Sequence, residues 1–308
     1  MRRRTDEQTH EHPASAGISR RAFFGCCLGA AVVAAGGGAV LDDRRDTISP
    51  VLREVVVPVR GLKRELSVVQ ATDLHARRLD PSYSGIAALL DGRHVDAAVM
   101  TGDILDVPIG DRQPAYDLAG ALQAITRNVF FLPGNHDPAD LGDDLASRGV
   151  IPLQHARPVG IDTSDPMGHE VALVYGVDSA SIAAASGYGS QLLVIASHTP
   201  PNESRLSAGA ALGSGSRLFI AGHTHGGQIR VPGIGALFAP MSWEVEEGGH
   251  AGTTDFTFLP DLRRKFVDGL YKHEGQRIFV SVGLGTTLVH ARLFDRAELV
   301  LLHFVPSA

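Results

Sequence analysis

Cysteine is almost absent from this chain. Of its 308 residues only Cys26 and Cys27 are cysteines, and both lie near the N-terminus. Residues 46–308 therefore contain no disulfide, no thiolate ligand and no cysteine nucleophile. A metal ion bound by that part of the chain must be held by nitrogen and oxygen atoms of His, Asp, Glu or Asn.

Basic side chains are also few beyond the N-terminus, and lysine occurs only as Lys63, Lys265 and Lys272. The whole chain has 28 Lys and Arg against 34 Asp and Glu; residues 1–45 hold 7 and 5 of these, which leaves 21 against 29. Nucleic-acid binding needs clustered basic side chains that displace counterions from phosphates. We therefore expect no nucleic acid as a partner, whereas a small anionic substrate fits if bound cations reverse the charge locally.

Residues 1–45 are interpreted as an export or anchoring segment. Ser19, Arg20, Arg21 and Phe23 precede about 20 uncharged, Gly- and Ala-rich residues, a layout that resembles a twin-arginine export signal. No clear small-residue cleavage site follows, and about 20 apolar residues just suffice to span a bilayer. We expect export by the twin-arginine route to the outer face of the cytoplasmic membrane, the cell envelope or the medium, with membrane attachment if the segment stays uncleaved. An ordinary transmembrane anchor or a general secretory signal is the alternative.

Residues 46–308 are predicted to form one catalytic domain of the α/β class. Short apolar runs typical of buried strands occur at 66–73, 96–103, 128–137, 191–198 and 217–225. Between the first three, helical spacing places Ile86 with Leu90 and Leu118 with Leu122 on shared faces. Strands that alternate with helices indicate βαβ units and a largely parallel core.

The second half of the chain is richer in strand patterns. Further runs at 169–178, 277–285 and 296–304 predict more than one sheet. The span 238–270 has the weakest pattern, and we expect it to be a long surface excursion.

Five predicted strands end in residues that bind metals or transfer protons. These are Asp73 with His75, Asp103 with Asp106, Asn135 with His136 and Asp137, His198, and His223 with His225. Each has an ordinary explanation when taken alone: a polar turn, a helix N-cap or a core histidine. Because the carboxyl ends of strands form the functional crevice of α/β sheets, their joint occurrence predicts one site.

The types of donor atom restrict the chemistry of that site. Carboxylate, imidazole and amide ligands without thiolate fit Mn²⁺, Fe²⁺ or Zn²⁺ better than they fit a structural zinc. Two ligand groups that share one carboxylate hold two ions roughly 3.5–4 Å apart, which suits the displacement of a phosphoryl group. The donor types therefore predict divalent metal, and two divalent ions as cofactors if the ligands form two such groups.

The order DLH, GDILD, GNHD, SHTP and GHTHGGQ resembles the calcineurin-like metallophosphoesterases over about residues 60–305. The resemblance implies a four-layer α/β/β/α sandwich of two mixed sheets flanked by helices. It also implies the ligands, which are Asp73, His75 and His225 for one ion, Asn135, His198 and His223 for the other, and Asp103 as the bridge. We expect the segment around His223 and His225 to be extended, with the two rings directed toward different ions.

A bacterial subgroup resembles the chain more closely. The segments GHTHGGQIRVPG and GLYKHEGQRIFVSVGLGTT are similar to segments of exported phosphoesterases and of UDP-2,3-diacylglucosamine pyrophosphatases. This resemblance implies a small or lipid-linked phosphoester substrate. Ser179 and Pro201 stand where that subgroup is expected to have Asp, so the substrate contacts depart from its pattern.

The resemblance implies hydrolysis of a phosphodiester, pyrophosphate or phosphomonoester by a hydroxide that bridges the two ions. His136 would be the general acid or charge stabiliser at the leaving oxygen, and Asp106 would orient its ring. For Asp137 two roles remain open, a supporting partner of the ligands or a plain turn residue.

Purple acid phosphatases have a tyrosine at the position of Asp106, so no tyrosinate-iron site is expected. The alternative function is a non-catalytic metal- or partner-binding protein on the same scaffold, against which the non-ligand His136 argues.

Overall fold

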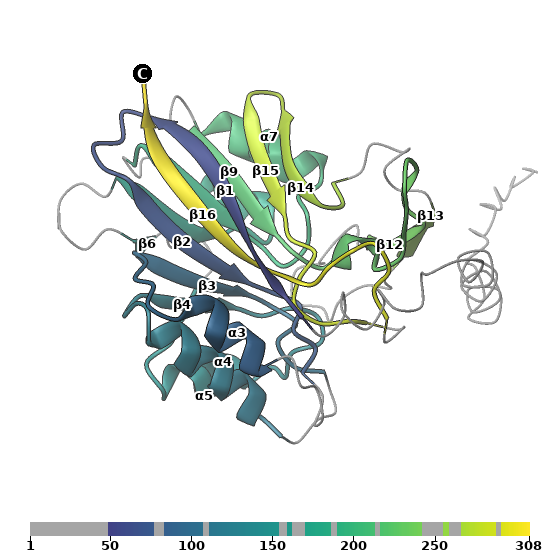
Figure 1. The fold of residues 1–308 in the computed structure, drawn as a ribbon. Helices are drawn as coiled ribbons and strands as arrows, with labels where there is room; N and C mark the ends of the chain where they lie inside the picture. Colours follow the sequence, from purple (N-terminus) through teal and green to yellow (C-terminus); the bar gives the residue numbers. More distant parts are fainter. Residues whose placement is uncertain are drawn as a thin grey trace, which may run out of the picture. The chain divides into compact units, whose positions relative to one another are not determined.

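Two six-stranded sheets lie face to face in the part of the chain that the structure describes (Figure 1). The structure is a computed structural model that describes residues 49–76, 83–106, 111–153, 159–161, 170–185, 190–212, 216–241, 255–258, 266–287 and 291–308. The predicted export segment at residues 1–45 lies outside these residues. Within them, no helix has both the length and the apolar composition that a membrane crossing requires.

The first sheet contains three of the predicted strands in its parallel part. Its order is β1 (Val51–Arg60), β16 (Glu298–Ser307), β2 (Leu66–Ala71), β3 (Ala97–Thr101), β4 (Val129–Leu132) and β5 (Ile151–Pro152). Strands β2 to β5 are parallel to one another, whereas β16 is antiparallel to β2 and parallel to β1. The predictions at 66–73, 96–103, 128–137 and 296–304 are confirmed as β2, β3, β4 and β16, and β1 was not predicted.

The second sheet has the same mixed character. Its order is β14 (Gly269–His273), β15 (Gln276–Val280), β9 (Ser216–Ala221), β8 (Leu192–Ala196), β7 (Val171–Tyr175) and β6 (Val159–Gly160). The four central strands are parallel, and the two edge strands are antiparallel to their neighbours. The prediction of more than one sheet is therefore confirmed.

Helices cover the outer face of each sheet. Apolar side chains of α3 (Tyr83–Leu90), α4 (Gln113–Gln123) and α5 (Leu141–Ala146) pack on the first sheet. Those of α6 (Ser179–Ala183) and α7 (Glu203–Ala211) pack on the second sheet. The layers are helices, sheet, sheet and helices, so the four-layer α/β/β/α sandwich is confirmed.

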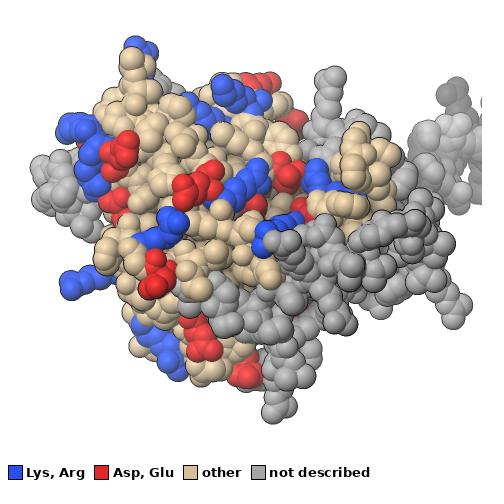
Figure 2. Space-filling view, in the orientation of Figure 1, with Lys and Arg blue, Asp and Glu red and all other residues tan. Residues whose placement is uncertain are grey.

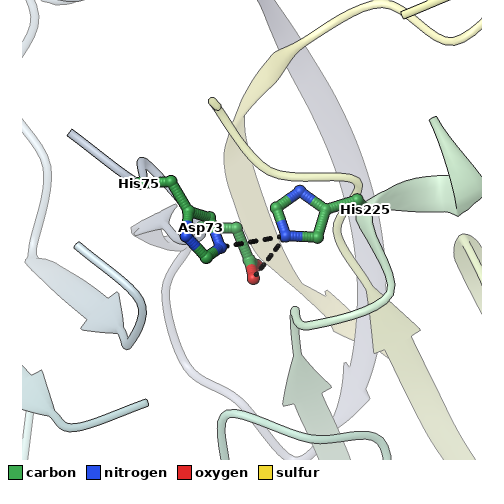
Figure 3. Close-up of side chains that lie close together, drawn as sticks. All are labelled: Asp73, His75 and His225. Carbon is green, nitrogen blue, oxygen red and sulfur yellow. Dashed lines mark hydrogen bonds and ion pairs between the residues drawn. The ribbon is translucent and has the colours of Figure 1, made fainter. Parts of the chain in front are cut away.

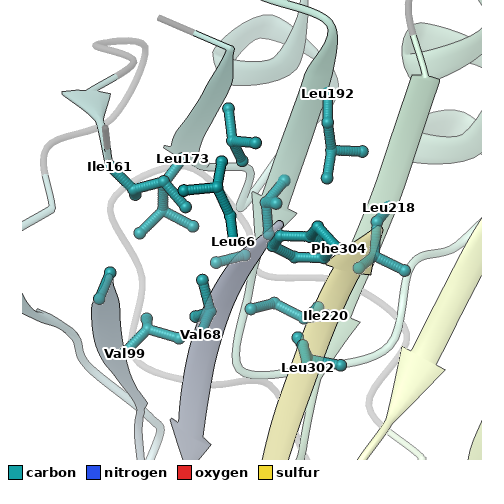
Figure 4. Close-up of a cluster of buried hydrophobic side chains, with 14 of the residues drawn as sticks. Leu66, Val68, Val99, Ile161, Leu173, Leu192, Leu218, Ile220, Leu302 and Phe304 are labelled. Atoms are coloured by element: carbon teal, nitrogen blue, oxygen red, sulfur yellow. The ribbon is translucent and has the colours of Figure 1, made fainter. Parts of the chain in front are cut away.

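An apolar cluster lies between the sheets (Figure 4). In β2, Leu66 and Val68 face the second sheet, while Val69 and Ala71 face the helices. This alternation follows from the two-residue period of a strand. Burial of a large apolar side chain contributes about 1.5–3 kcal/mol, so the cluster holds the strand ends of both sheets in fixed relative positions.

Two small antiparallel pairs follow β9. They are β10 (Arg230–Val231) with β11 (Gly235–Ala236), and β12 (Phe238–Met241) with β13 (Asp255–Phe258). The second pair lies within the predicted surface excursion at 238–270 and belongs to neither large sheet. Part of that excursion is thus regular structure, because its two segments satisfy each other's backbone groups.

Charges of both signs are interspersed over the described residues. Figure 2 shows one face on which Lys and Arg alternate with Asp and Glu. Ion pairs of this kind include Arg64 with Asp96 and Arg93 with Glu54. The described residues on this face form no continuous basic strip of the type that binds nucleic-acid phosphates.

Candidate metal centre

Loops at the carboxyl ends of five parallel strands meet in the fold. Three follow β2, β3 and β4 of the first sheet, and two follow β8 and β9 of the second. Backbone hydrogen bonds join neighbouring loops: Asp73 N donates to Gly102 O at 3.0 Å, and Gly222 N donates to His198 O at 2.9 Å. The predicted site residues are therefore neighbours in space although they lie as far apart in the sequence as Asp73 and His225.

Asp73, His75 and His225, called the first group below, converge through their side-chain donor atoms (Figure 3). The Nε2 atoms of His75 and His225 lie 3.1 Å apart, and His225 Nε2 lies 3.5 Å from Asp73 Oδ1. All three residues are buried. One ion could contact a donor atom of each.

Asp103, His198 and His223, called the second group below, converge in the same way. His198 Nε2 lies 3.0 Å from His223 Nδ1 and 3.1 Å from Asp103 Oδ2. Asn135 was predicted to join this group. Its buried Oδ1 has no hydrogen-bond partner among the described residues, which suits an oxygen reserved for a ligand.

Asp103 connects the two groups. Its Oδ2 lies 3.4 Å from His75 Nε2 and 3.1 Å from His198 Nε2. A single carboxylate oxygen therefore lies between an imidazole of the first group and an imidazole of the second, which is the arrangement that a shared bridging ligand requires.

Partners on the opposite ring nitrogens orient two of these histidines. His75 Nδ1 donates to Asp106 Oδ1 at 2.6 Å, and His198 Nδ1 donates to Thr101 O at 3.0 Å. With Nδ1 occupied, Nε2 of each ring points toward its group. Carboxylate or carbonyl partners of this kind fix the tautomer of metal-binding histidines.

The backbone at these residues is strained. Five predicted ligands have a left-handed backbone, with φ of 54° at Asp73, 44° at His75, 51° at Asp103, 70° at His223 and 51° at His225. Such conformations cost about 1–3 kcal/mol for a residue other than glycine and cluster at functional sites. The strain lets short loops turn their side chains back toward one point.

The expectation of an extended segment around His223 and His225 was wrong. The backbone bends at His223 and enters a short 3₁₀ turn, η1 (His225–Gly227). The two rings still belong to different groups. In an extended strand the two side chains, two residues apart, would lie on the same face. Left-handed backbone at both histidines separates them.

Glycines allow backbone to approach both carboxylates. A Cβ on Gly222 would overlap Asp73 Oδ2, and a Cβ on Gly134 would overlap Asp103 Oδ1. Because both glycines lack a Cβ, the backbone comes close enough to form hydrogen bonds. His223 N donates to Asp73 Oδ2 at 2.9 Å, and His136 N donates to Asp103 Oδ1 at 2.8 Å. Backbone amides thus fix the carboxylates and leave oxygen lone pairs for other ligands.

The electrostatics of the site favour a cation. Burial raises the pKa of Asp73, and within the described residues the ion pairs of Asp73 and Asp103 are with histidines alone. Burial opposes ionisation of Asp103 too, but His198 and His75 hold its pKa well below the usual range. Burial would lower the pKa of His198, whereas Asp103 and Asp73 raise it to about 10. The two carboxylates therefore attract positive charge, which a divalent ion supplies in a dry site.

Two other histidines of the groups are kept neutral. Burial lowers the pKa of His223 to about 3 and that of His225 well below its usual value. Neutral imidazole is the form that binds metals. The donor set thus fits divalent ions in ligand type, and His223 and His225 are already in the form that binds metals.

His136 and Asp106 form a pair at the edge of the first group. His136 Nδ1 lies 3.2 Å from Asp106 Oδ1, and the side chain of His136 is 41% exposed. The hydrogen bond to Asp106 raises the pKa of His136. A partly exposed, protonatable imidazole next to buried ligands can deliver a proton to a bound molecule.

Asp137 is a supporting residue rather than a plain turn residue. Its Oδ1 accepts from Ile104 N at 2.8 Å and Leu105 N at 2.9 Å, and its Oδ2 accepts from Gly134 N at 2.9 Å. These bonds tie the loop after β4 to the loop after β3.

Sequence reasoning missed Arg292. This arginine is fully buried, and its guanidinium donates to carbonyls of the loops that carry His225 and residues 282–285. Neither strand periodicity nor the spacing of metal ligands marks an arginine in this position, so the sequence alone held no signal for it.

Sequence comparisons relate the chain to a family of known proteins. Residues 66–227 match the family model of the calcineurin-like phosphoesterases. The chain is 25% identical over 268 residues to the uncharacterized metallophosphoesterase Cj0846 of Campylobacter jejuni, an alignment that covers 83% of this chain and 63% of that protein. It is 25% identical over 250 residues to the uncharacterized metallophosphoesterase YkoQ of Bacillus subtilis, with 77% and 82% covered. The chain thus spans less than two thirds of the Campylobacter protein.

A solved structure is also similar to part of the chain. It is the crystal structure of phosphopantetheinyl hydrolase (PptH) from Mycobacterium tuberculosis, at 13% identity. The match covers 75% of this chain and 96% of that chain, with a TM-score of 0.37.

Proposed function

Since the chain belongs to the calcineurin-like phosphoesterase family, we propose that it is a dinuclear metal-dependent hydrolase of a phosphodiester, pyrophosphate or phosphomonoester at the cell envelope. Membership of a metallophosphoesterase family and the His and Asp clusters support hydrolysis with bound metal.

One observation carries the dinuclear proposal. Asp103 Oδ2 lies within 3.4 Å of both His75 Nε2 and His198 Nε2, so one oxygen borders both groups. The first group and the second group with Asn135 would each hold one ion of the type Mn²⁺, Fe²⁺ or Zn²⁺. Such ions neutralise phosphoryl charge and lower the pKa of water.

The chain's own groups complete the reaction. His136, which is no member of the proposed ligand set, donates a proton to the leaving oxygen. Asp106 accepts from His136 Nδ1 and thereby keeps Nε2 toward the substrate. The backbone amides of His223 and His136 hold the carboxylates of Asp73 and Asp103 in place for the ions.

Hydrolysis of bis(p-nitrophenyl) phosphate and p-nitrophenyl phosphate by the Mn²⁺-loaded full chain tests the reaction class. We expect turnover in wild type, loss to background in Asp103→Asn, and wild-type rates in Asp140→Asn, which changes an exposed carboxylate paired with Arg112. A metal-loaded protein that hydrolyses neither ester would favour the non-catalytic binding function.

The substrate class is proposed from the resemblance of the chain's motifs to exported and lipid-substrate phosphoesterases. A panel of a nucleotide diphosphate-lipid, a cyclic nucleotide, a glycerophosphodiester and a monoester separates the possibilities through kcat/KM. We expect preference for a diester or a pyrophosphate. A clear preference for the monoester would contradict that expectation.

The location is proposed from residues 1–45. Changing Arg20-Arg21 to Lys-Lys should retain the protein in the cytoplasm, because the twin-arginine pair is read as an address. The matched control, Arg44-Arg45→Lys-Lys, changes a second arginine pair and should still be exported. Normal export of the first variant would rule out this route.

A further inference from the structure

Arg292 has an unusual environment for an arginine. It is fully buried, and a buried guanidinium is costly unless its donors are satisfied. Its Nε donates to Gly285 O at 3.1 Å, and its Nη2 donates to Val282 O and to Gly285 O, each at 2.6 Å. Its Nη1 donates to His225 O at 3.4 Å and to Asp295 Oδ2 at 3.2 Å.

The carbonyls that bind Arg292 belong to loops on two sides of the first group. One is the carbonyl of His225 itself. The others belong to residues 282–285, which contact Asp73: Gly285 N donates to Asp73 O at 2.7 Å, and Leu284 N donates to Thr72 O at 3.0 Å. One guanidinium therefore joins the backbone of His225 to the loop that packs on Asp73.

The same backbone is strained. Asp73 and His225 have φ of 54° and 51°, which residues other than glycine seldom adopt. Sparsely populated conformations persist only when the surrounding structure over-determines them. The planar fork of Arg292, with donors in fixed directions, supplies such a constraint.

We propose that Arg292 is a positioning residue of the first group, which sets Asp73 and His225 for ion binding. Asp295 supports it, because it is buried, pairs with Nη1 of Arg292, and lies where a Cβ on Gly226 would collide with its carboxylate. The inference rests on the proposed function, since it assumes that the first group binds an ion.

Arg292→Lys tests this role, because lysine keeps the charge but cannot reach carbonyls in several directions at once. The readout is Mn²⁺ titration of the metal-free full chain by calorimetry. We expect a two-site isotherm for wild type and a dissociation constant raised about 10–100-fold at one site in the variant, the usual effect of losing an outer partner. The control is Arg296→Lys in the same segment, whose Nε donates to Ser49 O, and it should bind as wild type.

A double-mutant comparison identifies the affected site. Arg292→Lys should add no further loss of Mn²⁺ affinity in a His225→Ala background, because the first group is already incomplete. It should add its full loss in a His198→Ala background, which changes the second group. Equal losses in both backgrounds would indicate general destabilisation and overturn the proposal.

Circular dichroism and thermal unfolding in EDTA check that each variant folds. If Arg292→Lys does not fold, Asp295→Asn replaces it, and a loss of affinity confined to one site is expected again. Wild-type affinity at both sites in the folded variant would contradict the role of Arg292 alone. A wild-type chain that does not bind two ions would contradict both this role and the dinuclear function.

Discussion

Asp106 Oδ1 accepts hydrogen bonds from two histidines, His75 Nδ1 at 2.6 Å and His136 Nδ1 at 3.2 Å. The first partner belongs to the first group, and the second is the proposed general acid. A change at Asp106 should therefore affect both metal affinity and turnover. The shorter bond goes to His75, which the sequence pattern did not indicate.

Replacing Asp106 with Asn tests how these two effects divide. A neutral amide accepts more weakly than a carboxylate, so His136 loses the partner that raises its pKa. We expect kcat to fall about 10²–10³-fold, within the range for proton transfer. Metal content, measured by mass spectrometry, should fall much less. A variant with full activity would remove Asp106 from the reaction.

His136→Ala should leave both ions bound, because His136 belongs to neither group. We expect a fall in kcat of about 10²–10⁴-fold for an alkyl leaving group, which needs a proton. The fall should be smaller for p-nitrophenolate, which leaves without one. Loss of bound metal in this variant would instead show that His136 is a ligand.

At the scale of the elements, the site is built by loops rather than by the strands themselves. Strands β2, β3, β8 and β9 each end two residues before the first donor side chain of the loop that follows. Residues with left-handed backbone then turn the donor side chains toward the metal site, and glycines leave room for the close approach of the loops. The strands fix where each loop starts, and the loops fix where the donors point.

Gly222→Ala should damage the site, because its Cβ would overlap Asp73 Oδ2 and Thr72 Oγ1, both buried. We expect Mn²⁺ affinity to fall and the midpoint of thermal unfolding to drop. The control is Gly120→Ala in α4, where a Cβ meets nothing within 4 Å. In a helix this control should raise stability by up to about 1 kcal/mol. Unchanged Mn²⁺ binding in Gly222→Ala would show that the loop can move without loss.

At the scale of the whole described domain, packing of one sheet on the other brings the two groups together. Each group combines residues from loops that follow strands of both sheets. Gln70 of β2 also links the sheets, because its Nε2 donates to Thr101 Oγ1 and to Ala221 O, each at 3.1 Å. Metal binding and folding should therefore be coupled.

Removal of metal should lower thermal stability. Buried Asp73 and Asp103 lose their divalent counter-charge, and a ligand at 1,000 times its Kd adds about 4 kcal/mol to the folded state. That corresponds to roughly 10 °C in Tm for a domain of this size. Calorimetry with EDTA and then with excess Mn²⁺ measures the shift, and Asp103→Asn should reduce it. An identical Tm in both conditions would contradict metal binding in the folded state.

Much of the fold was predictable because its signals are local. Buried strands at 66–73, 96–103 and 191–198 are short apolar runs, and the stripe of Leu118 and Leu122 is helical. Strand β1 was missed because it is an edge strand with alternating exposure and a proline, Pro58, in its sequence. The left-handed bend at His223 was missed because two histidines one residue apart fit an extended strand equally well.

By itself the sequence determined the donor types and their places at five strand ends, because ligand chemistry and strand periodicity depend on nearby residues. The resemblance to a family then indicated which donors bind which of the two ions. Tertiary structure alone decided that one oxygen of Asp103 lies between the groups, that Asp106 serves His75 as well as His136, and that Arg292 holds the His225 loop. These contacts join residues from loops of two packed sheets, and only the packing of those sheets sets their distances.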